Sequence, residues 1–408
     1  MSSTTRVQLS VMMFLEFFIW GGWFVTLGTF LNNNLSASGA ESGQVFSTQS
    51  WGAIIAPFII GLIADRFVNA EKILGILHLI GAVLMYQMYS ADNIAVFYPY
   101  VLIYMICYMP TLALVNSVSF NQMKNPEKEF SVIRLFGTLG WIAAGLLISY
   151  LFHWDSAEGT KEGLLKNTFL LSGVASLVLG LFSFTLPKTP PKGKGTKVTV
   201  NDILGLDALK LLKDKNFLIF FISSILICIP LAFYYQNTNS FLSSIGVENP
   251  TGKMTIGQGS EVLFLLLLPV FFNRFGFKKT ILVGMLAWAV RYVLFAYGNA
   301  GDLTFMLLIG IALHGICYDF FFVSGQIYTD SKAGEQHKSA AQGLITLATY
   351  GLGMLIGFAV AGKITDSYKL ADGTLDYKMV WLIPAGIAFA VFLIFALLFK
   401  DEKTNKAA

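Results

Sequence analysis

The chain is a succession of long apolar segments separated by short polar ones. A helix that crosses a bilayer needs about 20 mostly apolar residues, and such segments recur along the whole sequence. They predict twelve transmembrane helices, at residues 8–31, 45–65, 72–90, 94–121, 131–153, 167–186, 216–243, 256–273, 279–298, 302–328, 339–364 and 378–399. No gap between them could hold a separate soluble domain. The pattern therefore predicts an all-α polytopic membrane protein.

The longest gap divides these segments into two groups of six. It contains Pro190, Pro191 and several lysines, a composition typical of a flexible basic linker. We expect an N-terminal half at 1–187, a cytoplasmic linker at 188–215 and a C-terminal half at 216–408.

Short sequence matches relate the two halves. Ile-Cys-Tyr at 106–108 recurs at 316–318, and Thr-Phe-Leu at 29–31 corresponds to Ser-Phe-Leu at 240–242. Because six segments separate the copies, both have the same membrane orientation, and two such halves form the fold of major facilitator transporters. Residues 61–66 fit the GxxxDR signature of that superfamily; an ordinary polar helix end is the alternative interpretation. In this fold the two halves move around a binding site near the membrane midplane.

Composition and charge agree with a membrane protein. The sequence is 55% hydrophobic and 13% charged, about half the charge of soluble domains. The net charge of +4 is small, and the basic residues lie in short loops, so we expect no nucleic-acid partner. Most of the 28 Lys and Arg residues face the cytoplasm if the N-terminus does, which predicts that both termini are cytoplasmic.

Several ionisable residues lie inside the predicted helices. A charge at a helix centre costs roughly 2.5–3.5 kcal/mol on insertion scales, so such residues need partners or a wet cavity. The set comprises Glu16, Arg134, Glu261, Arg291, His314 and Asp319. We interpret Arg291 as a structural residue, and for Glu16 a structural and a functional role are both open.

The fifth segment places Arg134, Thr138 and Trp141 on one helix face, at positions i, i+4 and i+7. A guanidinium, a hydroxyl and an indole in a row suit a ligand with a flat ring and several oxygens. The alternative is that Arg134 only anchors the helix end to lipid headgroups.

The eighth and tenth segments carry the remaining candidates. Gln258 and Glu261 are i, i+3 neighbours, and His314, Tyr318 and Asp319 share one face by the same kind of spacing. A carboxylate in an apolar cavity is suited to take up and release a proton near neutral pH. An internal ion pair, or a core histidine with satisfied hydrogen bonds, is the structural alternative.

Motifs for other chemistry are absent from the sequence. It has no Walker A loop, HExxH, GxSxG or CxxC pair. We therefore expect neither an enzyme nor an ATP-driven pump, and no cofactor or metal.

The chain resembles the nucleoside:proton symporters of the major facilitator superfamily over nearly its whole length. The resemblance is carried by FIWGGWFVTLGTF, YMPTLALVNSVSF, IRLFGTLGW, LGLDALKLLKDKN, QGSEVLFLLLLPVFFNRFGFKK, WAVRYVLFAYG and CYDFFFVSG. It implies proton-driven uptake of nucleosides across the bacterial inner membrane by a carrier that works as a monomer.

The resemblance also implies which residues meet the substrate and the proton. It assigns substrate binding to Arg134, Thr138, Trp141, Tyr235, Gln236, Gln258, Glu261, His314 and Tyr318, and proton coupling to Glu261 and Asp319. Trp141 and Tyr318 stand where a Phe is familiar in the family, and His314 where a Tyr is familiar. In the seventh helix the family's amide pair aligns with Ala232 and Tyr235, so Gln236 is the candidate replacement.

Two other functions fit the same residues. A sugar or glycoside carrier would use the same amide and carboxylate contacts to hydroxyl groups. A non-transporting membrane sensor could keep the fold, although a scaffold gains nothing from the insertion cost of the buried polar residues.

Overall fold

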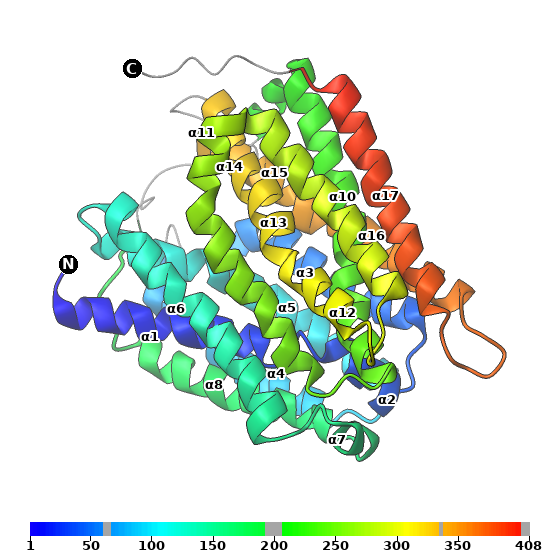
Figure 1. Ribbon diagram of the computed structural model, residues 1–408. Coiled ribbons are helices and arrows are strands. Elements are labelled where there is room, and N and C mark those ends of the chain that lie inside the picture. The colour runs from blue at the N-terminus through cyan, green and yellow to red at the C-terminus, as the bar shows by residue number, and fades with distance from the viewer. Residues whose placement is uncertain (60–66, 192–205, 334–337, 401–408) are drawn as a thin grey trace. The chain divides into compact units, whose positions relative to one another are not determined.

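The computed structural model describes residues 1–59, 67–191, 206–333 and 338–400, and these are almost entirely helical (Figure 1). Within them no β-strand forms, although an isolated bridge pairs Lys369 with Leu375. Nine helical segments of this part are long and apolar enough to cross a membrane by length and composition. The all-helical, multi-pass architecture is confirmed, while the count of twelve spans stays a prediction. The GxxxDR segment at 61–66 and linker residues 192–205 lie outside the described residues.

The chain divides into two compact units. The first comprises Met1–Thr199 together with Tyr235–Thr255, and the second comprises Val200–Tyr234 together with Ile256–Ala408. Each of the long helices α10 and α11 therefore contributes to both units.

The helices of the first unit follow the predicted segments closely. They are α1 (Ser3–Gly21), α2 (Leu27–Asn34), α3 (Gly39–Ile59), α4 (Ala70–Tyr89), α5 (Ile94–Gln122), α6 (Pro126–Leu146), the π-helical turn η2 (Leu147–Leu151), α7 (Ala157–Lys161), the 3₁₀ turn η3 (Leu164–Lys166) and α8 (Asn167–Ser183). The predicted segment 8–31 is broken into α1 and α2. Two consecutive glycines, Gly21 and Gly22, stand at the break, and glycine is a poor helix former.

Small residues let the helices of the first unit approach closely. Helix α1 packs against α5, α6 and α8, while α4 packs against α5 and α8. A Cβ atom added to Gly140 of α6 would overlap the carbonyl oxygen of Phe14 in α1, and one added to Gly28 of α2 would overlap that of Gln236. Close backbone approach at small residues is typical of membrane helices.

Residues 235–255 are tied to the first unit by polar side chains. Thr29 Oγ1 donates to Asn239 Oδ1 at 2.6 Å, and Asn32 Nδ2 donates to Ser240 Oγ at 2.7 Å. Asp155 Oδ2 accepts from the backbone N–H of Thr251 at 2.9 Å, next to the start of α11. These bonds join segments that are far apart in the sequence.

The second unit contains the remaining helices and the rest of α10 and α11. They are the 3₁₀ turn η4 (Leu206–Lys213), α10 (Lys215–Ser244), α11 (Pro250–Tyr297), α12 (Thr304–Ala312), α13 (His314–Tyr318), the π-helical turn η5 (Asp319–Val323), α14 (Ser324–Ala333), α15 (Lys338–Thr346), the π-helical turn η6 (Leu347–Gly353), α16 (Met354–Ser367) and α17 (Tyr377–Leu398). Helix α11 covers two predicted segments, 256–273 and 279–298. A kink separates them at Gly276, whose φ of 75° is readily adopted only by glycine.

Aromatic side chains fill the interior of the second unit. The rings of Tyr292 and Trp381 stack with centroids 5.5 Å apart, and both side chains are fully buried. The Tyr292 hydroxyl donates to the carbonyl oxygen of Pro230 at 2.5 Å. This bond ties α11 to α10 beside Pro230.

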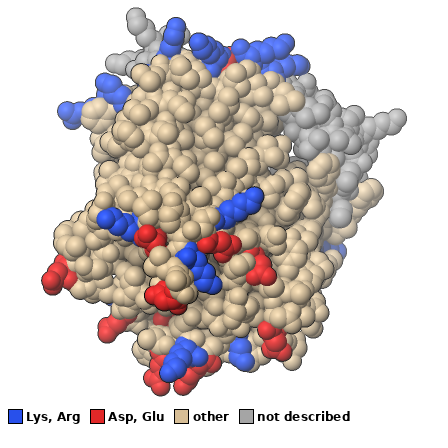
Figure 2. Space-filling model, turned by 90° about the vertical axis from the view of Figure 1, so that its right-hand side faces the viewer, with Lys and Arg blue, Asp and Glu red and all other residues tan. Residues whose placement is uncertain are grey.

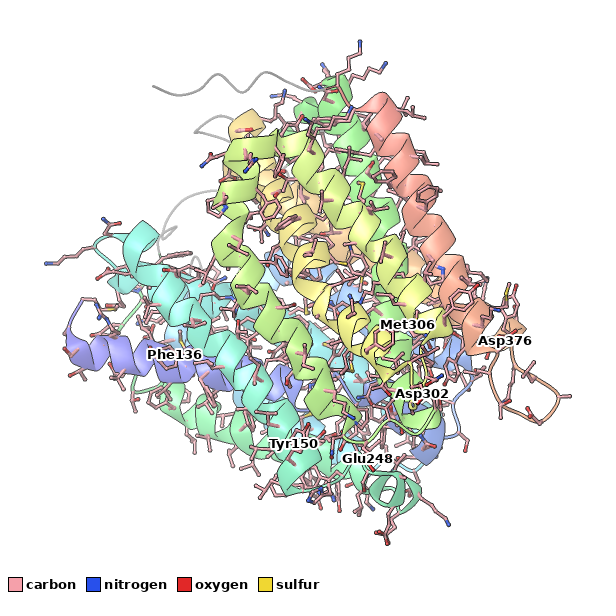
Figure 3. All side chains as sticks on the ribbon, in the orientation of Figure 1. Phe136, Tyr150, Glu248, Asp302, Met306 and Asp376 are labelled. Atoms are coloured by element: carbon pink, nitrogen blue, oxygen red, sulfur yellow. The ribbon has the colours of Figure 1, made fainter. Side chains whose placement is uncertain are left out.

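Large apolar side chains are exposed on both units. Leu266 and Val270 of α11 are 73% and 61% exposed, and Leu397 of α17 is 81% exposed. On the face shown in Figure 2, uncharged side chains cover most of the surface and charged ones gather in groups. In the second unit, Asp302 and Asp376 lie in connections beside helix ends (Figure 3). Such extensive apolar exposure is what a lipid environment requires.

Candidate functional site

The first candidate set lies on α6 as the sequence predicts. Arg134, Thr138 and Trp141 are all half-buried, whereas Leu135 and Leu139 of the same helix are exposed. The three side chains therefore share the face of α6 that is partly covered by protein. Helical periodicity alone places them together.

Arg134 lies over an aromatic ring of α1. Its guanidinium carbon is 4.1 Å from the centroid of the Phe17 ring, a cation–π distance. Gly137 makes room for it, because a Cβ atom there would lie 2.7 Å from Nη1 of Arg134. Nη1 is buried and has no hydrogen-bond partner among the described residues. A buried nitrogen of this kind does not fit a side chain that reaches to lipid headgroups, and it leaves a donor available to a ligand.

Trp141 belongs to an aromatic group formed with α1. Its ring lies 5.6 Å from that of Trp20, in an edge-to-face arrangement. Gly21 allows the contact, since a Cβ atom there would lie 2.8 Å from the Trp141 ring. The indole N–H of Trp20 is buried without a partner in the described part of the chain. The group thus combines aromatic surface with a free donor.

Tyr235 and Gln236 fall in the part of α10 that belongs to the first unit. The Tyr235 ring lies 5.7 Å from that of Phe24. Gln236 is buried, and its Nε2 donates to the carbonyl oxygen of Gly39 at 3.2 Å. Its Oε1 is buried without a partner among the described residues. One end of this amide therefore binds the protein, and the other presents an acceptor.

In the second unit, α11 and α13 approach closely around the other candidates. The backbone N–H of Gly315 donates to Ser260 Oγ at 3.0 Å, and a Cβ atom on Gly315 would lie 2.5 Å from the Ser260 carbonyl oxygen. This contact brings Glu261 to His314, with Oε2 of the carboxylate 3.9 Å from Nε2 of the imidazole. Gln258 and Glu261 are both half-buried.

His314 is held between two side chains that sequence reasoning did not connect with it. Its Nδ1 lies 3.2 Å from Nη1 of Arg291, and its ring stacks on Tyr234 at 5.3 Å. The guanidinium carbon of Arg291 lies 3.5 Å from the centroid of the same Tyr234 ring. Arg291 is fully buried. Because a guanidinium only donates, Nδ1 of His314 accepts, and Nε2 carries the hydrogen on the side of Glu261.

Tyr318 and Asp319 follow His314 in α13 and η5. The Tyr318 hydroxyl lies 2.5 Å from that of Tyr350 in η6. Asp319 is 1% exposed, begins the π-helical turn η5, and interacts electrostatically with Glu261. Its Oδ2 is buried without a hydrogen-bond partner in the described residues. π-Helical turns are frequent at functional sites, and a buried oxygen without a donor is a place where a proton can bind.

The described residues contain no group of three or more His, Cys, Asp or Glu side chains arranged to hold a metal ion. The polar atoms of the two sets are instead amide, hydroxyl, imidazole, guanidinium and carboxylate groups beside aromatic rings. This chemistry suits a ligand that has both a flat ring and hydroxyl groups.

Comparison with known proteins decides the family. The sequence profile described as "Nucleoside H+ symporter" matches residues 3–404. The chain belongs to the nucleoside H+ symporter family.

Individual members of the family resemble this symporter over their full length. YegT of Escherichia coli (strain K12) is 42% identical, over 99% of this chain and 96% of that protein. The xanthosine permease of the same organism is 33% identical, over 97% of this chain and 96% of that protein. A crystal structure of the nucleoside transporter NupG, 31% identical, covers 98% of this chain and 100% of that one, with a TM-score of 0.87.

Family membership confirms the fold and the activity that the resemblance implied. The chain is a proton-coupled nucleoside transporter with a major facilitator fold, and it is not an enzyme. The sugar-carrier and sensor alternatives are not favoured by these comparisons.

Sequence reasoning missed several residues that this symporter places beside the candidates. Tyr234 and Tyr350 contact His314 and Tyr318, and Arg291 binds His314 directly. Tyrosine gives no signal in a search for charged residues within apolar segments. Arg291 gave that signal, but the sequence could not show which residue of another helix it contacts.

Proposed function

We propose that this symporter imports nucleosides across the bacterial inner membrane by alternating access of the halves 1–187 and 216–408. Both termini are proposed to face the cytoplasm, because that orientation places most Lys and Arg residues there. The carrier is proposed to work as a monomer, as expected for this fold.

We propose that Arg134, Thr138 and Trp141 bind the nucleoside. The unpartnered Nη1 of Arg134 supports this role, since a buried donor without an acceptor is costly unless a ligand completes it. Trp141 would cover a face of the base, as indoles do with flat rings. Tyr235 and the free Oε1 of Gln236 are proposed to contribute an aromatic edge and an acceptor.

In the second half, Gln258, Glu261, His314 and Tyr318 are proposed to bind the substrate. Glutamine and glutamate side chains accept hydrogen bonds from ribose hydroxyls, and Gln258 also donates them. The imidazole of His314 presents its Nε2–H on the side of Glu261. Substrate hydroxyls and this N–H would then share the Glu261 carboxylate.

Glu261 and Asp319 are proposed to carry the coupled proton. The observation that carries this assignment is the buried Oδ2 of Asp319, which has no hydrogen-bond donor among the described residues and interacts electrostatically with Glu261. Two nearby carboxylates with little solvent do not both stay ionised readily. Proton uptake relieves that repulsion, and proton release restores it.

The test is uptake of radiolabelled uridine into proteoliposomes, with and without an inward proton gradient. We expect the wild type to accumulate uridine above its external concentration only with the gradient. Glu261→Gln and Asp319→Asn should lose accumulation but retain exchange of external for internal uridine. Asp302→Asn, which changes an exposed carboxylate in a loop, is the matched control and should behave as wild type.

Two results would contradict the assignment. Gradient-driven accumulation by both carboxylate variants would show that neither carries the proton. Uptake that free ribose or galactosides inhibit more strongly than unlabelled uridine or xanthosine do would favour the sugar alternative. Xanthosine is included because the xanthosine permease is a relative.

A further inference from the structure

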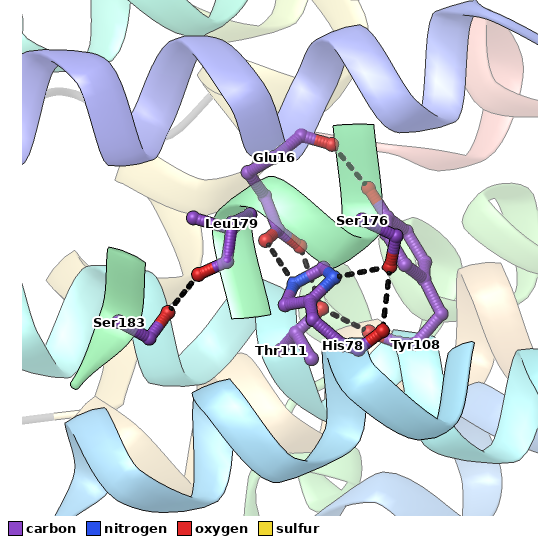
Figure 4. A network of polar contacts seen from close by, with 7 residues as sticks. All are labelled: Glu16, His78, Tyr108, Thr111, Ser176, Leu179 and Ser183. Atoms are coloured by element: carbon purple, nitrogen blue, oxygen red, sulfur yellow. Dashed lines mark hydrogen bonds and ion pairs between the residues drawn. The ribbon is translucent and has the colours of Figure 1, made fainter. Parts of the chain in front are cut away.

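A group of buried polar side chains outside the proposed substrate set lies within the first unit (Figure 4). Glu16 of α1 is fully buried, and His78 of α4 is 2% exposed. Oε2 of Glu16 lies 2.8 Å from Nε2 of His78, and Oε1 lies 2.6 Å from Oγ1 of Thr111 in α5. Both carboxyl oxygens are therefore engaged inside the protein.

The position of one proton on His78 follows from its contact with α8. Ser176 Oγ donates to the backbone oxygen of His78 at 2.9 Å and also lies 3.1 Å from its Nδ1. A hydroxyl has one hydrogen, so Ser176 Oγ must accept from the Nδ1–H of His78. The nitrogen that faces Glu16 is Nε2, and a single proton lies between it and Oε2 of the carboxyl group.

The Thr111 hydroxyl can form a hydrogen bond with Glu16 whether or not Oε1 of Glu16 carries a proton. Its Oγ1 lies 2.6 Å from Glu16 Oε1 and 2.5 Å from the carbonyl oxygen of Tyr108, which can only accept. When the hydroxyl donates to Oε1, that oxygen carries no proton. When the hydroxyl donates to Tyr108, Oε1 completes its own hydrogen bond only by carrying a proton. Turning one hydroxyl therefore lets the contacts accommodate both forms.

Another buried glutamate of the same unit shows the opposite arrangement. Glu71 is 3% exposed; its Oε2 accepts from the backbone N–H of Thr189 at 2.8 Å and its Oε1 from Asn69 Nδ2 at 2.9 Å. Both partners only donate, so protonation of Glu71 would cost it a hydrogen bond. Glu71 is a structural carboxylate and a matched comparison for Glu16.

We propose that Glu16 and His78 form a second proton-binding site, distinct from Glu261 and Asp319. The proton adds to Oε1 of Glu16, the Thr111 hydroxyl turns to Tyr108, and the pair changes from net neutral to a net charge of +1. A net charge in a buried place is costly, so the proton is held only while the acidic side supplies it. The proposal rests on proton-coupled transport by this chain.

Direct contacts connect this site to the proposed substrate set. The Tyr108 hydroxyl donates to the backbone oxygen of Glu16 at 2.8 Å. The Tyr108 ring lies 5.7 Å from that of Trp20, which lies 5.6 Å from that of Trp141. A change in the Glu16 contacts is therefore transmitted through two packed rings to the residue proposed to cover the base.

The other titratable groups near this site are few. Helix α8 contributes no titratable side chain, and α6 contributes Arg134, which interacts electrostatically with Tyr108. Helix α5 contributes Tyr104, Cys107 and Tyr108. Among the described residues none of these groups is a carboxylate, so Glu16 is the group that takes the proton.

The experiment measures two properties of purified full-length protein in proteoliposomes: uridine exchange at equal pH, and uridine accumulation driven by an inward proton gradient. Glu16→Gln copies the neutral form of the side chain. We expect this variant to retain exchange and to lose accumulation, down to the level reached without a gradient. Glu71→Gln should retain both. If Glu16→Gln accumulated uridine as the wild type does, the proposal would be overturned. The Glu16–His78 pair would then be purely structural and would not control coupling.

A second pair of variants tests the proposal independently, in case Glu16→Gln fails to fold. Thr111→Ser keeps the hydroxyl and should accumulate uridine as the wild type does, whereas Thr111→Val removes it and should lose accumulation while retaining exchange. Equal accumulation by both would overturn the proposal. Absence of gradient-driven accumulation in the wild type would instead contradict proton-coupled uridine import itself.

Discussion

Nη1 of Arg291 lies 3.2 Å from Nδ1 of His314, inside the second unit. The guanidinium can only donate, so it fixes His314 as the tautomer whose hydrogen is on Nε2. That hydrogen lies on the side of Glu261, 3.9 Å away. Arg291 is thus a positioning residue for the imidazole that faces Glu261. The Tyr234 ring, 3.5 Å from its guanidinium carbon, holds it in place.

This relationship predicts that Arg291 and His314 are energetically coupled. His314→Phe keeps a ring to stack on Tyr234 but leaves a buried donor without an acceptor, which costs about 1–3 kcal/mol. Arg291→Leu leaves Nδ1 unpaired in turn. In the double variant both groups are apolar, so it should recover much of the stability that each single variant loses. Thermal unfolding of all four proteins in detergent measures this coupling. Strictly additive losses of stability in the two single variants would show that the contact between Arg291 and His314 does not stabilise the fold.

The close contact between α1 and α6 predicts that Gly140 tolerates no side chain. A Cβ atom there overlaps the carbonyl oxygen of Phe14, so Gly140→Ala must separate the helices. We expect a loss of about 1–3 kcal/mol, as for other overpacked sites, and reduced uptake, because Arg134 and Trp141 lie on α6.

The control is Gly386→Ala in α17, where an added Cβ atom meets nothing within 4 Å. Alanine is the better helix former by about 1 kcal/mol, so this variant should be as stable as the wild type or more so. The melting temperatures of the two variants decide the comparison. Equal values would mean that the helices can shift at Gly140 without cost.

The contacts of Asp214 at the start of α10 predict that its contribution to the stability of the fold depends on pH. The backbone N–H of Phe217 donates to its Oδ1 at 2.9 Å and Lys332 lies 3.4 Å from its Oδ2; these contacts hold the pKa of Asp214 below its usual value. A carboxylate with a lowered pKa stabilises the fold above its unfolded pKa of about 3.9, and the stabilisation is lost as the pH falls through the folded pKa.

Asp214→Ala should therefore lower stability at neutral pH by about 0.5–2 kcal/mol, the range for a lost N-cap. The difference from wild type should shrink as the pH falls below about 4 and through the lowered pKa of the folded protein, because the wild-type carboxylate then becomes protonated. Asp214→Asn, which can still cap the helix, should lose less at neutral pH. Melting curves at several pH values test this, and a difference independent of pH would rule out the charged cap.

The contact between Asn32 and Ser240 predicts a position where transport can be locked. Nδ2 of Asn32 lies 2.7 Å from Oγ of Ser240, and the two residues belong to different proposed halves of the chain. Alternating access requires such contacts to break in each cycle. Asn32→Cys combined with Ser240→Cys, joined by a short reducible thiol cross-linker, should therefore stop uridine uptake, and reduction should restore it.

The single-cysteine variants are the controls for this experiment. They should transport normally with the reagent present, since the native Cys228 and Cys317 are buried and Cys107 is half-buried. Normal uptake by the cross-linked double variant would show that this contact stays closed throughout transport.

The sequence by itself determined the helical segments, their polar faces and the family. Apolar segments of membrane-spanning length must form helices, because no other single-segment structure satisfies the backbone in lipid. The 3.6-residue period then placed Arg134, Thr138 and Trp141 on one face, and α6 has them there. Long ordered matches identified the symporter family, which the profile over residues 3–404 confirms.

Only the tertiary structure decided which residues of different helices meet. Helical spacing does not fix how a helix is rotated against its neighbours or how high it sits beside them, and these determine each side-chain contact. The pairing of Arg291 with His314, of Gln236 with Gly39 and of Glu16 with His78 had no counterpart in any spacing. These contacts depend on close packing at small residues such as Gly140 and Gly315, where the backbone of one helix contacts another helix.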